Sequence, residues 1–114
     1  MNFKAKHSFQ HRLDESLRIM TKYPERIPVI CEKKTGGNTP DIDKNKYLVP
    51  NDLTIGQFLF VLRKHIKLMS TEALYLFVNG SIPPTSELIQ NVYARNKDPD
   101  GFVYFVYACE NTFG

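Results

Sequence analysis

The residue of this sequence with the clearest chemical potential is its last one, Gly114. It ends the polar run Glu110-Asn111-Thr112-Phe113, which follows a strand-like segment at 102–107. Glycine has no Cβ, so its carboxyl carbon is unhindered and its backbone can enter a narrow cleft. Those properties suit a carboxylate that an enzyme activates and transfers as an acyl group. Glycine fills about 7% of positions by chance, so the weight of this ending depends on the rest of the chain.

The other reactive side chains form no recognisable catalytic or metal-binding motif. Cys31 and Cys109 lie in expected strands, and without a secretion signal they are expected to be free thiols. His7, His11 and His65 have no zinc-site spacing to them. Nucleophile-elbow and phosphate-loop sequences are also missing. The sequence therefore predicts a protein that is acted upon, not an enzyme, with neither cofactor nor metal.

Composition favours one small globular domain. The chain has 114 residues, 42% of them hydrophobic, which is enough for one core. No apolar run approaches the roughly 18 residues of a membrane span, and the first 20 residues do not resemble a signal peptide. Net charge is +3 and uneven, because the basic residues concentrate before residue 70. That half could meet anionic lipid or acidic peptides, whereas no nucleic-acid-binding motif is present.

A helix is predicted over 9–22, ahead of the main body. Ser8 can cap its start, and Tyr23-Pro24 ends it because the residue before proline avoids the helical conformation. Helical spacing predicts an apolar stripe that packs against the body, formed by Leu13, Leu17 and Met20.

The first half of the body reads as two strands and a helix. Strands are predicted at 26–32 and 46–50, joined by a loop at 34–40, with Pro28 making the first strand irregular. A helix then starts at Thr54, with Gln57 in capping-box spacing. Its expected buried face consists of Ile55, Phe58, Leu59, Leu62 and Ile66.

The second half supplies two more strands. These are predicted at 73–78, closed by an Asn79-Gly80 turn, and at 102–107, with a short helix over 86–95 between them. The order predicts an α+β protein with a β-grasp fold, in which one helix crosses a four-stranded mixed sheet. We expect a helical N-terminal extension (1–23), the β-grasp domain (24–107) and a flexible C-terminal tail (108–114).

Four segments resemble a known family. They read YPERIPVI at 23–30, DKNKYLVP at 43–50, LTIGQF at 53–58 and IPPTS at 82–86. Together they closely resemble the autophagy ubiquitin-like modifiers, the family of GABA-receptor-associated protein and the microtubule-associated light chains. The resemblance runs from about Phe3 to Gly114. It implies a ubiquitin-like β-grasp fold. Leu17 departs from it, since many relatives have a small or polar residue there.

The resemblance also implies a conjugation pathway. An E1-like enzyme would adenylate Gly114, and an E2-like enzyme would pass it to the amine of phosphatidylethanolamine. A cysteine protease would release it again. The conjugate would act in autophagosome formation and recruit cargo receptors, in the cytoplasm and on the autophagosomal membrane, or on a plastid membrane if the source is apicomplexan. Nothing follows Gly114 in this sequence, either because the gene encodes it as the last residue or because the sequence is that of a processed form. Conjugation is therefore expected without prior proteolysis.

The strand at 46–50 is a candidate docking edge. Its residues alternate between two faces, and Pro50 with nearby lysines suits an edge position. An edge can accept a peptide strand, with main-chain bonds giving affinity and side pockets giving selectivity. By resemblance the peptide carries an aromatic-x-x-aliphatic motif with acidic neighbours.

The resemblance implies which residues contact such a peptide. The aromatic pocket would be Glu15, Ile19, Pro28, Ile30, Lys46, Leu48 and Phe102. The aliphatic pocket would be Tyr47, Val49, Pro50, Leu53, Phe58 and Val61. The acidic flank would meet Arg26, Lys44, Lys46 and Arg63, and processing enzymes would contact Tyr75 and Phe77. A simpler interpretation makes the apolar members core residues and Arg63 part of a solvated helix face. His65 replaces a basic residue common in relatives and receives no role.

Two other functions remain open from the sequence. A soluble adaptor could bind receptor or cytoskeletal peptides without conjugation, and it would not need Gly114. A modifier conjugated to other proteins would need Gly114, and only the acceptor would distinguish it.

Overall fold

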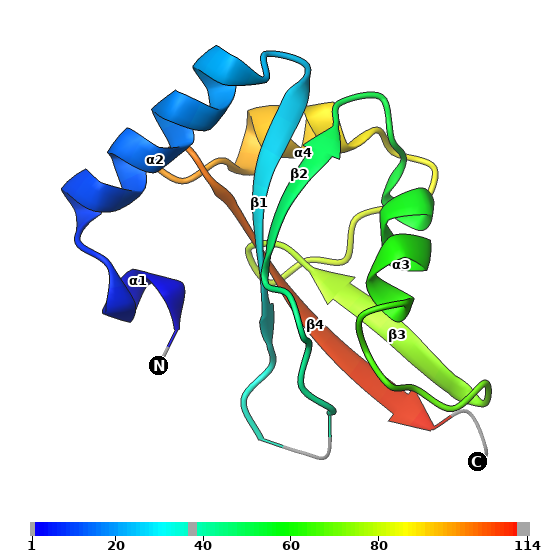
Figure 1. The fold of residues 1–114 in the computed structure, drawn as a ribbon. Helices are drawn as coiled ribbons and strands as arrows, with labels where there is room; N and C mark the ends of the chain where they lie inside the picture. The colour runs from blue at the N-terminus through cyan, green and yellow to red at the C-terminus, as the bar shows by residue number, and fades with distance from the viewer. Residues whose placement is uncertain (1, 37–38, 112–114) are drawn as a thin grey trace.

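The protein is described here by a computed structural model that covers residues 2–36 and 39–111. Its helices are α1 (Phe3–Lys6), α2 (Phe9–Lys22), α3 (Ile55–Arg63) and α4 (Ile89–Asn96). Its strands are β1 (Arg26–Lys33), β2 (Lys46–Pro50), β3 (Glu72–Phe77) and β4 (Val103–Asn111). The strands form one sheet in the order β2-β1-β4-β3 (Figure 1). The two central strands are parallel and both outer pairs are antiparallel, which confirms the mixed β-grasp sheet.

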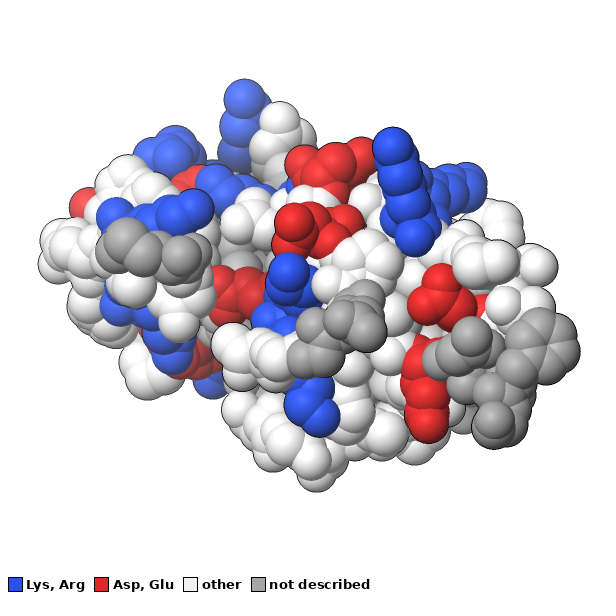
Figure 2. Space-filling model, turned by 90° about the horizontal axis from the view of Figure 1, so that it is seen from below, with Lys and Arg blue, Asp and Glu red and all other residues white. Residues whose placement is uncertain are grey.

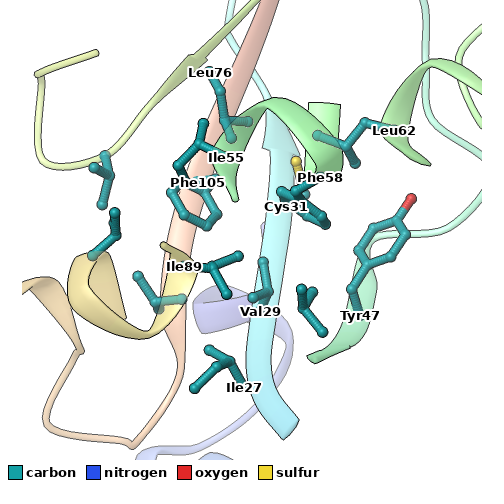
Figure 3. Packing of buried hydrophobic residues seen from close by; sticks show 14 of the residues in the cluster. Ile27, Val29, Cys31, Tyr47, Ile55, Phe58, Leu62, Leu76, Ile89 and Phe105 are labelled. Carbon is teal, nitrogen blue, oxygen red and sulfur yellow. The ribbon is translucent and has the colours of Figure 1, made fainter. Parts of the chain in front are cut away.

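The sheet separates two apolar clusters. Because side chains alternate along a strand, Val29 and Cys31 of β1 join the main core, whereas Ile30 between them faces the other side. The main core packs β1, β2 and β4 against α3 and α4, as seen where Tyr47 and Phe58 come from β2 and α3 (Figure 3). The smaller cluster packs Phe3 and α2 against the opposite face.

Helix α3 forms as its sequence predicts. Thr54 and Gln57 complete a reciprocal capping box, with the Gln57 N–H donating to Thr54 Oγ1 and Gln57 Oε1 accepting from the Thr54 N–H. The expected inner face is buried at Ile55, Phe58, Leu62 and Ile66, while Leu59 is half-buried. The helix is therefore fixed at its start and along one side.

The stripe predicted for α2 is wrong for two of its three residues, whereas the third, Leu13, is half-buried. Leu17 is 53% exposed and Met20 is 37% exposed, whereas the helix buries Arg12, Ser16 and Ile19. Polar contacts decide the orientation: Arg12 Nη1 donates to Asp100 Oδ2 at 2.5 Å, and Ser16 Oγ donates to the Asp100 carbonyl at 2.5 Å. These bonds satisfy the polar groups that lie beneath the helix.

A glycine lets α2 approach this loop closely. Gly101 has a φ of +92°, and a Cβ added there would lie 2.2 Å from Ser16 Oγ. Asp100 also accepts hydrogen bonds from the Tyr104 hydroxyl and from the Phe102 N–H. We call Arg12, Ser16, Asp100, Gly101 and Tyr104 the α2 latch. Arg12 and Ser16 lie more than 80 positions before the other three residues, so an apolar periodicity could not reveal the latch.

The ends of three other elements differ from expectation. The strand at 102–107 continues to Asn111, so residues 108–111, expected in a flexible tail, instead pair with β3. Residues 112–114, including Gly114, lie outside the described part. Helix α4 starts at Ile89, not at residue 86, because the carbonyls of Thr85 and Glu87 accept from the first N–H groups of α3.

Strand β1 is continuous across Pro28, contrary to the predicted irregularity. The Asn51 N–H donates to the Glu25 carbonyl and the Cys31 N–H to the Asn45 carbonyl, so odd-numbered β1 residues bond to β2. Pro28 therefore faces Leu48 at a position that needs no donor, and pairing with β4 starts only at Val29. The Asn79-Gly80 turn is confirmed, with φ values of +48° and +79°.

Candidate functional site

Strand β2 lies at an edge of the sheet and pairs only with β1 within the described residues. Tyr47 and Val49 are buried in the main core, while Lys46, Leu48 and Pro50 are half-buried on the other face. One outward carbonyl, that of Leu48, accepts from Arg26 Nη1 at 3.1 Å. The edge therefore presents backbone groups that an added strand could pair with, and it has an apolar cluster on each side.

On the α3 side, the edge borders an open cavity of about 230 Å³. Its lining contains all six residues expected in the aliphatic pocket: Tyr47, Val49, Pro50, Leu53, Phe58 and Val61. The cavity is also lined by Arg26, Lys44, Leu48 and His65. Tyr47 and Phe58 meet edge to face, with ring centroids 5.5 Å apart. The space is thus an apolar slot with nitrogen-bearing side chains around it.

Tyr47 connects the slot to its charged surroundings. The Nζ of Lys44 lies 5.1 Å from the centroid of the Tyr47 ring, and the His65 ring lies 5.7 Å from it. His65 Nδ1 is 2.7 Å from Asp43 Oδ1. Burial raises the pKa of Tyr47, so the phenol stays neutral, and its buried hydroxyl has no partner among the described residues. Lys44 and His65 therefore touch the ring that forms the slot.

On the α2 side, the expected aromatic pocket is already packed. Ile19, Pro28, Ile30 and Phe102 are buried and Leu48 is half-buried against them. Lys46 of β2 forms an ion pair with Glu15 of α2, and so ties the helix to the edge strand. The structure thus brings four of the seven expected residues, Ile19, Ile30, Leu48 and Phe102, together in one cluster. Pro28 lies opposite Leu48 in the sheet, and Glu15 and Lys46 pair with each other.

Phe3 belongs to that cluster, although the sequence analysis did not include it. It is 5% exposed, and its ring lies 5.4 Å from that of Phe102. The Phe3 N–H donates to Glu32 Oε2 at 2.7 Å, and Lys4 Nζ bonds Asp98 Oδ1 at 2.5 Å. Helix α1 is therefore pinned over the aromatic side by its apolar ring and two polar bonds.

Two residues near α3 lie differently from what the sequence analysis expected. Arg63, expected at the acidic flank, instead donates from Nη1 to the Glu72 carbonyl at 3.1 Å and does not line the slot. His65, which had no role, lines it. The spacing Phe58, Val61, His65 is i, i+3, i+7, which places all three on one side of a helix. Extending the α3 pattern by one turn would have identified His65.

The opposite edge of the sheet carries the expected enzyme-contact surface. Tyr75 and Phe77 share a face of β3, with Leu76 buried between them. Tyr75 is 36% exposed, Phe77 is half-buried and Lys34 Nζ lies 5.6 Å from the Phe77 ring centroid. Both aromatic side chains are therefore accessible from outside.

A larger cavity of about 620 Å³ lies beyond the Lys46 end of β2, lined in part by Phe3, Cys31, Asn45 and Tyr107. Burial raises the pKa of the Cys31 thiol, which disfavours the reactive thiolate.

Acidic and basic side chains alternate over the face seen in Figure 2. Within residues 2–36 and 39–111, no cluster is arranged to hold a metal ion, and no helix is long and apolar enough to cross a bilayer.

Comparison with known proteins gives one consistent result. Residues 11–114 match the family model described as autophagy protein Atg8, ubiquitin-like. The chain is 53% identical over 112 residues to autophagy-related protein 8 of Candida albicans, covering 98% of this chain and 83% of that protein. It is 53% identical over 113 residues to autophagy-related protein 8b of Arabidopsis thaliana, covering 99% and 93%.

Solved structures agree with the sequence matches. The crystal structure of Trypanosoma brucei ATG8 superposes with a TM-score of 0.92 at 38% identity, covering 100% of this chain and 98% of that one. Plasmodium falciparum Atg8, in complex with a Plasmodium falciparum Atg3 peptide, superposes with a TM-score of 0.87 at 38% identity, covering 95% of each chain.

Proposed function

The chain belongs to the Atg8 family of autophagy ubiquitin-like proteins, and from this premise we propose that it is a modifier conjugated through Gly114 to phosphatidylethanolamine. It acts in autophagosome formation, in the cytoplasm and on the autophagosomal membrane. The observation that carries the proposal is the family match, which extends to residue 114. The folded body supplies a docking surface, and the glycine supplies the reactive group.

The proposed chemistry takes place on the Gly114 carboxylate. An E1-like enzyme uses ATP to form the acyl adenylate with release of pyrophosphate, and its thiol then displaces AMP to give a thioester. An E2-like enzyme accepts the acyl group by thioester exchange. The amine of the lipid then attacks the carbonyl, forming an amide and releasing the E2-like thiol. The protein is the transferred group throughout, so it needs no catalytic side chain of its own.

The proposed partners follow from the surfaces. The family match and the Atg3-peptide complex of the Plasmodium relative support an E2-like partner, and we place processing and conjugation contacts at Tyr75 and Phe77. A cysteine protease that cleaves the amide to the lipid completes the cycle. Cargo receptors with aromatic-x-x-aliphatic motifs dock as an added strand on β2, parallel to it, with the aliphatic anchor in the open slot.

Reconstitution tests this proposal. The chain ending at Gly114 is incubated with the E1-like and E2-like enzymes, ATP and vesicles containing phosphatidylethanolamine, with the protease omitted. We expect a membrane-bound product whose mass equals protein plus lipid minus water. Gly114→Ala should slow conjugation strongly, because the added Cβ crowds the acyl carbon. A matched control, Gly80→Ala, changes a glycine in the turn after β3 and leaves the C-terminus intact.

The alternatives predict different products. No conjugate, with a related protein conjugating under the same conditions, favours the soluble adaptor. A conjugate whose mass identifies a protein acceptor in cells favours the third possibility. Conjugation of Gly114→Ala at the unmodified rate would show that glycine is not required there.

A further inference from the structure

The two most exposed large apolar side chains in the described part of the chain lie on the segment that leads from α3 into β3. Met69 is 67% exposed and Phe60 is 65% exposed. Lys64 and Lys67 are also exposed, and Lys64 Nζ lies 4.8 Å from the centroid of the Phe60 ring. Single exposed apolar residues are common on protein surfaces, whereas these two alternate with lysines. We call the four residues the α3–β3 surface.

A hydrogen-bonded turn holds Met69 beside the start of β3. The Glu72 N–H donates to the Met69 carbonyl at 3.0 Å, and the Met69 N–H donates to Glu72 Oε1 at 3.1 Å. Such a turn keeps its first and last Cα atoms within about 7 Å. Glu72 pairs with Asn111 across β3 and β4, and paired Cα atoms are about 5 Å apart. Met69 therefore lies within about 12 Å of Asn111.

The position of Gly114 brings a membrane to the same end of the molecule. Gly114 is three residues beyond Asn111, and three extended residues span at most about 11 Å. The proposed conjugation joins Gly114 to a lipid, so the bilayer surface comes about as close to Asn111 as Met69 does. Figure 1 shows the loop after α3 and the end of β4 together, at the end of the molecule opposite to α2.

The charges of the α3–β3 surface suit lipid phosphates. Within residues 2–36 and 39–111, neither Lys64 nor Lys67 forms an ion pair. The two carboxylates that share a cavity with them, those of Asp41 and Asp43, bond other side chains instead. At a membrane interface, a lysine extends its charged end toward the phosphates while apolar neighbours enter the acyl boundary. The basic and apolar members of this surface therefore match two adjacent layers of a bilayer.

From this geometry we propose that the α3–β3 surface is a membrane-contact site, with its apolar members at the acyl boundary and its lysines facing lipid phosphates. The inference rests on the proposed conjugation. One lipid at Gly114 leaves the protein free to rotate about its tether. A second contact through Met69 limits that rotation and gives the conjugated protein one preferred orientation on the bilayer.

The rate of methionine oxidation tests the inference on the unmodified chain. Free protein and protein conjugated to vesicles of phosphatidylcholine, phosphatidylethanolamine and phosphatidylserine are treated with chloramine-T, and peptide mass spectrometry measures each sulfoxide. Met20 is the internal control. It bonds Tyr93, whose hydroxyl also reaches the Gly101 carbonyl just before β4, and that nine-residue strand separates it from Asn111 by about 30 Å.

Conjugation should slow the oxidation of Met69 about tenfold, the factor expected when the bilayer buries the 67% of this side chain that is exposed. The oxidation of Met20 should change little. Lys67→Gln should lower the protection of Met69 about fivefold, the contribution of one lysine near an anionic surface. Lys22→Gln, which changes an exposed lysine on α2, is the matched control and should keep the full protection.

The other outcomes separate the site from the conjugation. If Met69 is oxidised equally fast in free and conjugated protein, the inference is overturned and the conjugation stands. Equal protection of Met69 and Met20 would reflect general shielding by the vesicle, and it also overturns the inference. Protection that disappears when the conjugate is diluted over more vesicles would assign the surface to contact between copies of the chain instead of lipid. If no conjugate forms, the proposed function fails and the inference fails with it.

Discussion

The two sides of β2 are built differently. On the α3 side the edge strand borders an open slot of about 230 Å³. On the α2 side the corresponding apolar residues pack against each other and against Phe3, beneath the Lys46–Glu15 ion pair. A ligand anchor can therefore enter the first side directly, whereas on the second it must displace internal contacts.

This difference indicates how the two-anchor peptide proposed above would divide its binding energy. Burying a large apolar side chain stabilises by about 1.5–3 kcal/mol. For an anchor in the open slot, the whole free energy of burial would contribute to affinity. An anchor on the closed side would first displace Phe3 from its contacts, so part of its burial energy would be used to offset that loss. The closed side in turn depends on helix α2, which the α2 latch holds on the sheet. The following changes test each part of this division, from the largest expected effect to the smallest.

Gly101→Ala should have the largest effect, because it attacks the latch. The left-handed backbone alone costs about 1–2 kcal/mol for a residue with a Cβ. At Gly101, with φ +92°, that Cβ would also meet Ser16 Oγ at 2.2 Å. We expect the free energy of unfolding to fall by about 3 kcal/mol or more, measured by urea denaturation.

Gly80→Ala is the matched control, since its φ is +79° but open space surrounds it. It should lose only the backbone part of that energy, about 1–2 kcal/mol. Equal losses for the two variants would show that close approach of α2 to the loop does not matter.

Leu53→Ala should weaken peptide binding about tenfold, equal to about 1.4 kcal/mol. Leu53 is half-buried and lines the slot, so its loss removes contact with the aliphatic anchor. Leu59→Ala is the control, because Leu59 is also half-buried on the core but does not line the slot. Calorimetry with one aromatic-x-x-aliphatic peptide measures both. Similar weakening by the two variants would contradict a preformed slot.

Phe3→Ala should tighten binding of the same peptide about threefold, or about 0.6 kcal/mol. It empties part of the closed cluster and leaves the residues of the slot unchanged. The gain should depend on the aromatic anchor and vanish for a peptide with alanine at that position. Unchanged or weaker binding would indicate that the aromatic pocket opens without moving α1.

Lowering the pH should weaken the docking of α1 by a small amount, because it protonates Asp98, which pairs with Lys4 of this helix. Burial acts to raise the pKa of Asp98, but hydrogen bonds from Lys4 and from the Asp100 N–H outweigh it and lower the value. A carboxyl with a lowered folded pKa stabilises the protein above its unfolded value, near 3.8, and this is lost as pH falls through the folded value.

The measurement is the difference in melting temperature between the unmodified protein and Asp98→Asn. It should be positive at pH 7 and shrink towards zero below about pH 3.8. Asp41→Asn, which removes an exposed pair with Lys33, serves as the control on the other side of the molecule. If this melting-temperature difference stays constant down to acid pH, the charge of Asp98 does not contribute to holding α1 in place.

Local sequence signals were sufficient for elements that local forces fix. Helix α3 has both a capping box and an apolar face, and β2 starts and ends at the expected residues. The six residues of the aliphatic pocket could be predicted because the family resemblance implied them. The structure places all six around one slot. The peptide that would occupy the slot remains a proposal.

Long-range contacts account for what the sequence could not predict. Periodicity favoured Leu17 and Met20 as the inner face of α2, yet Ser16 and Arg12 are buried because Asp100, more than 80 positions away, bonds both. Likewise β4 extends past residue 107 because its residues 108–111 pair with residues 72–75 of the antiparallel strand β3. Apolar periodicity detects hydrophobic burial but not a polar group that is satisfied across the fold.

The parallel pairing of β1 with β4 has a mechanical consequence. A tether attached beyond Asn111 would pull β4 along its own axis, while a load held at β2 would pull on β1. The force would then cross the ladder that joins Val29–Lys33 to Val103–Tyr107 in shear. In that direction the hydrogen bonds share the load and must slip together, whereas peeling would break them one at a time. The strand order would thus resist tension in the arrangement proposed above, with a lipid at the C-terminus and a peptide on β2.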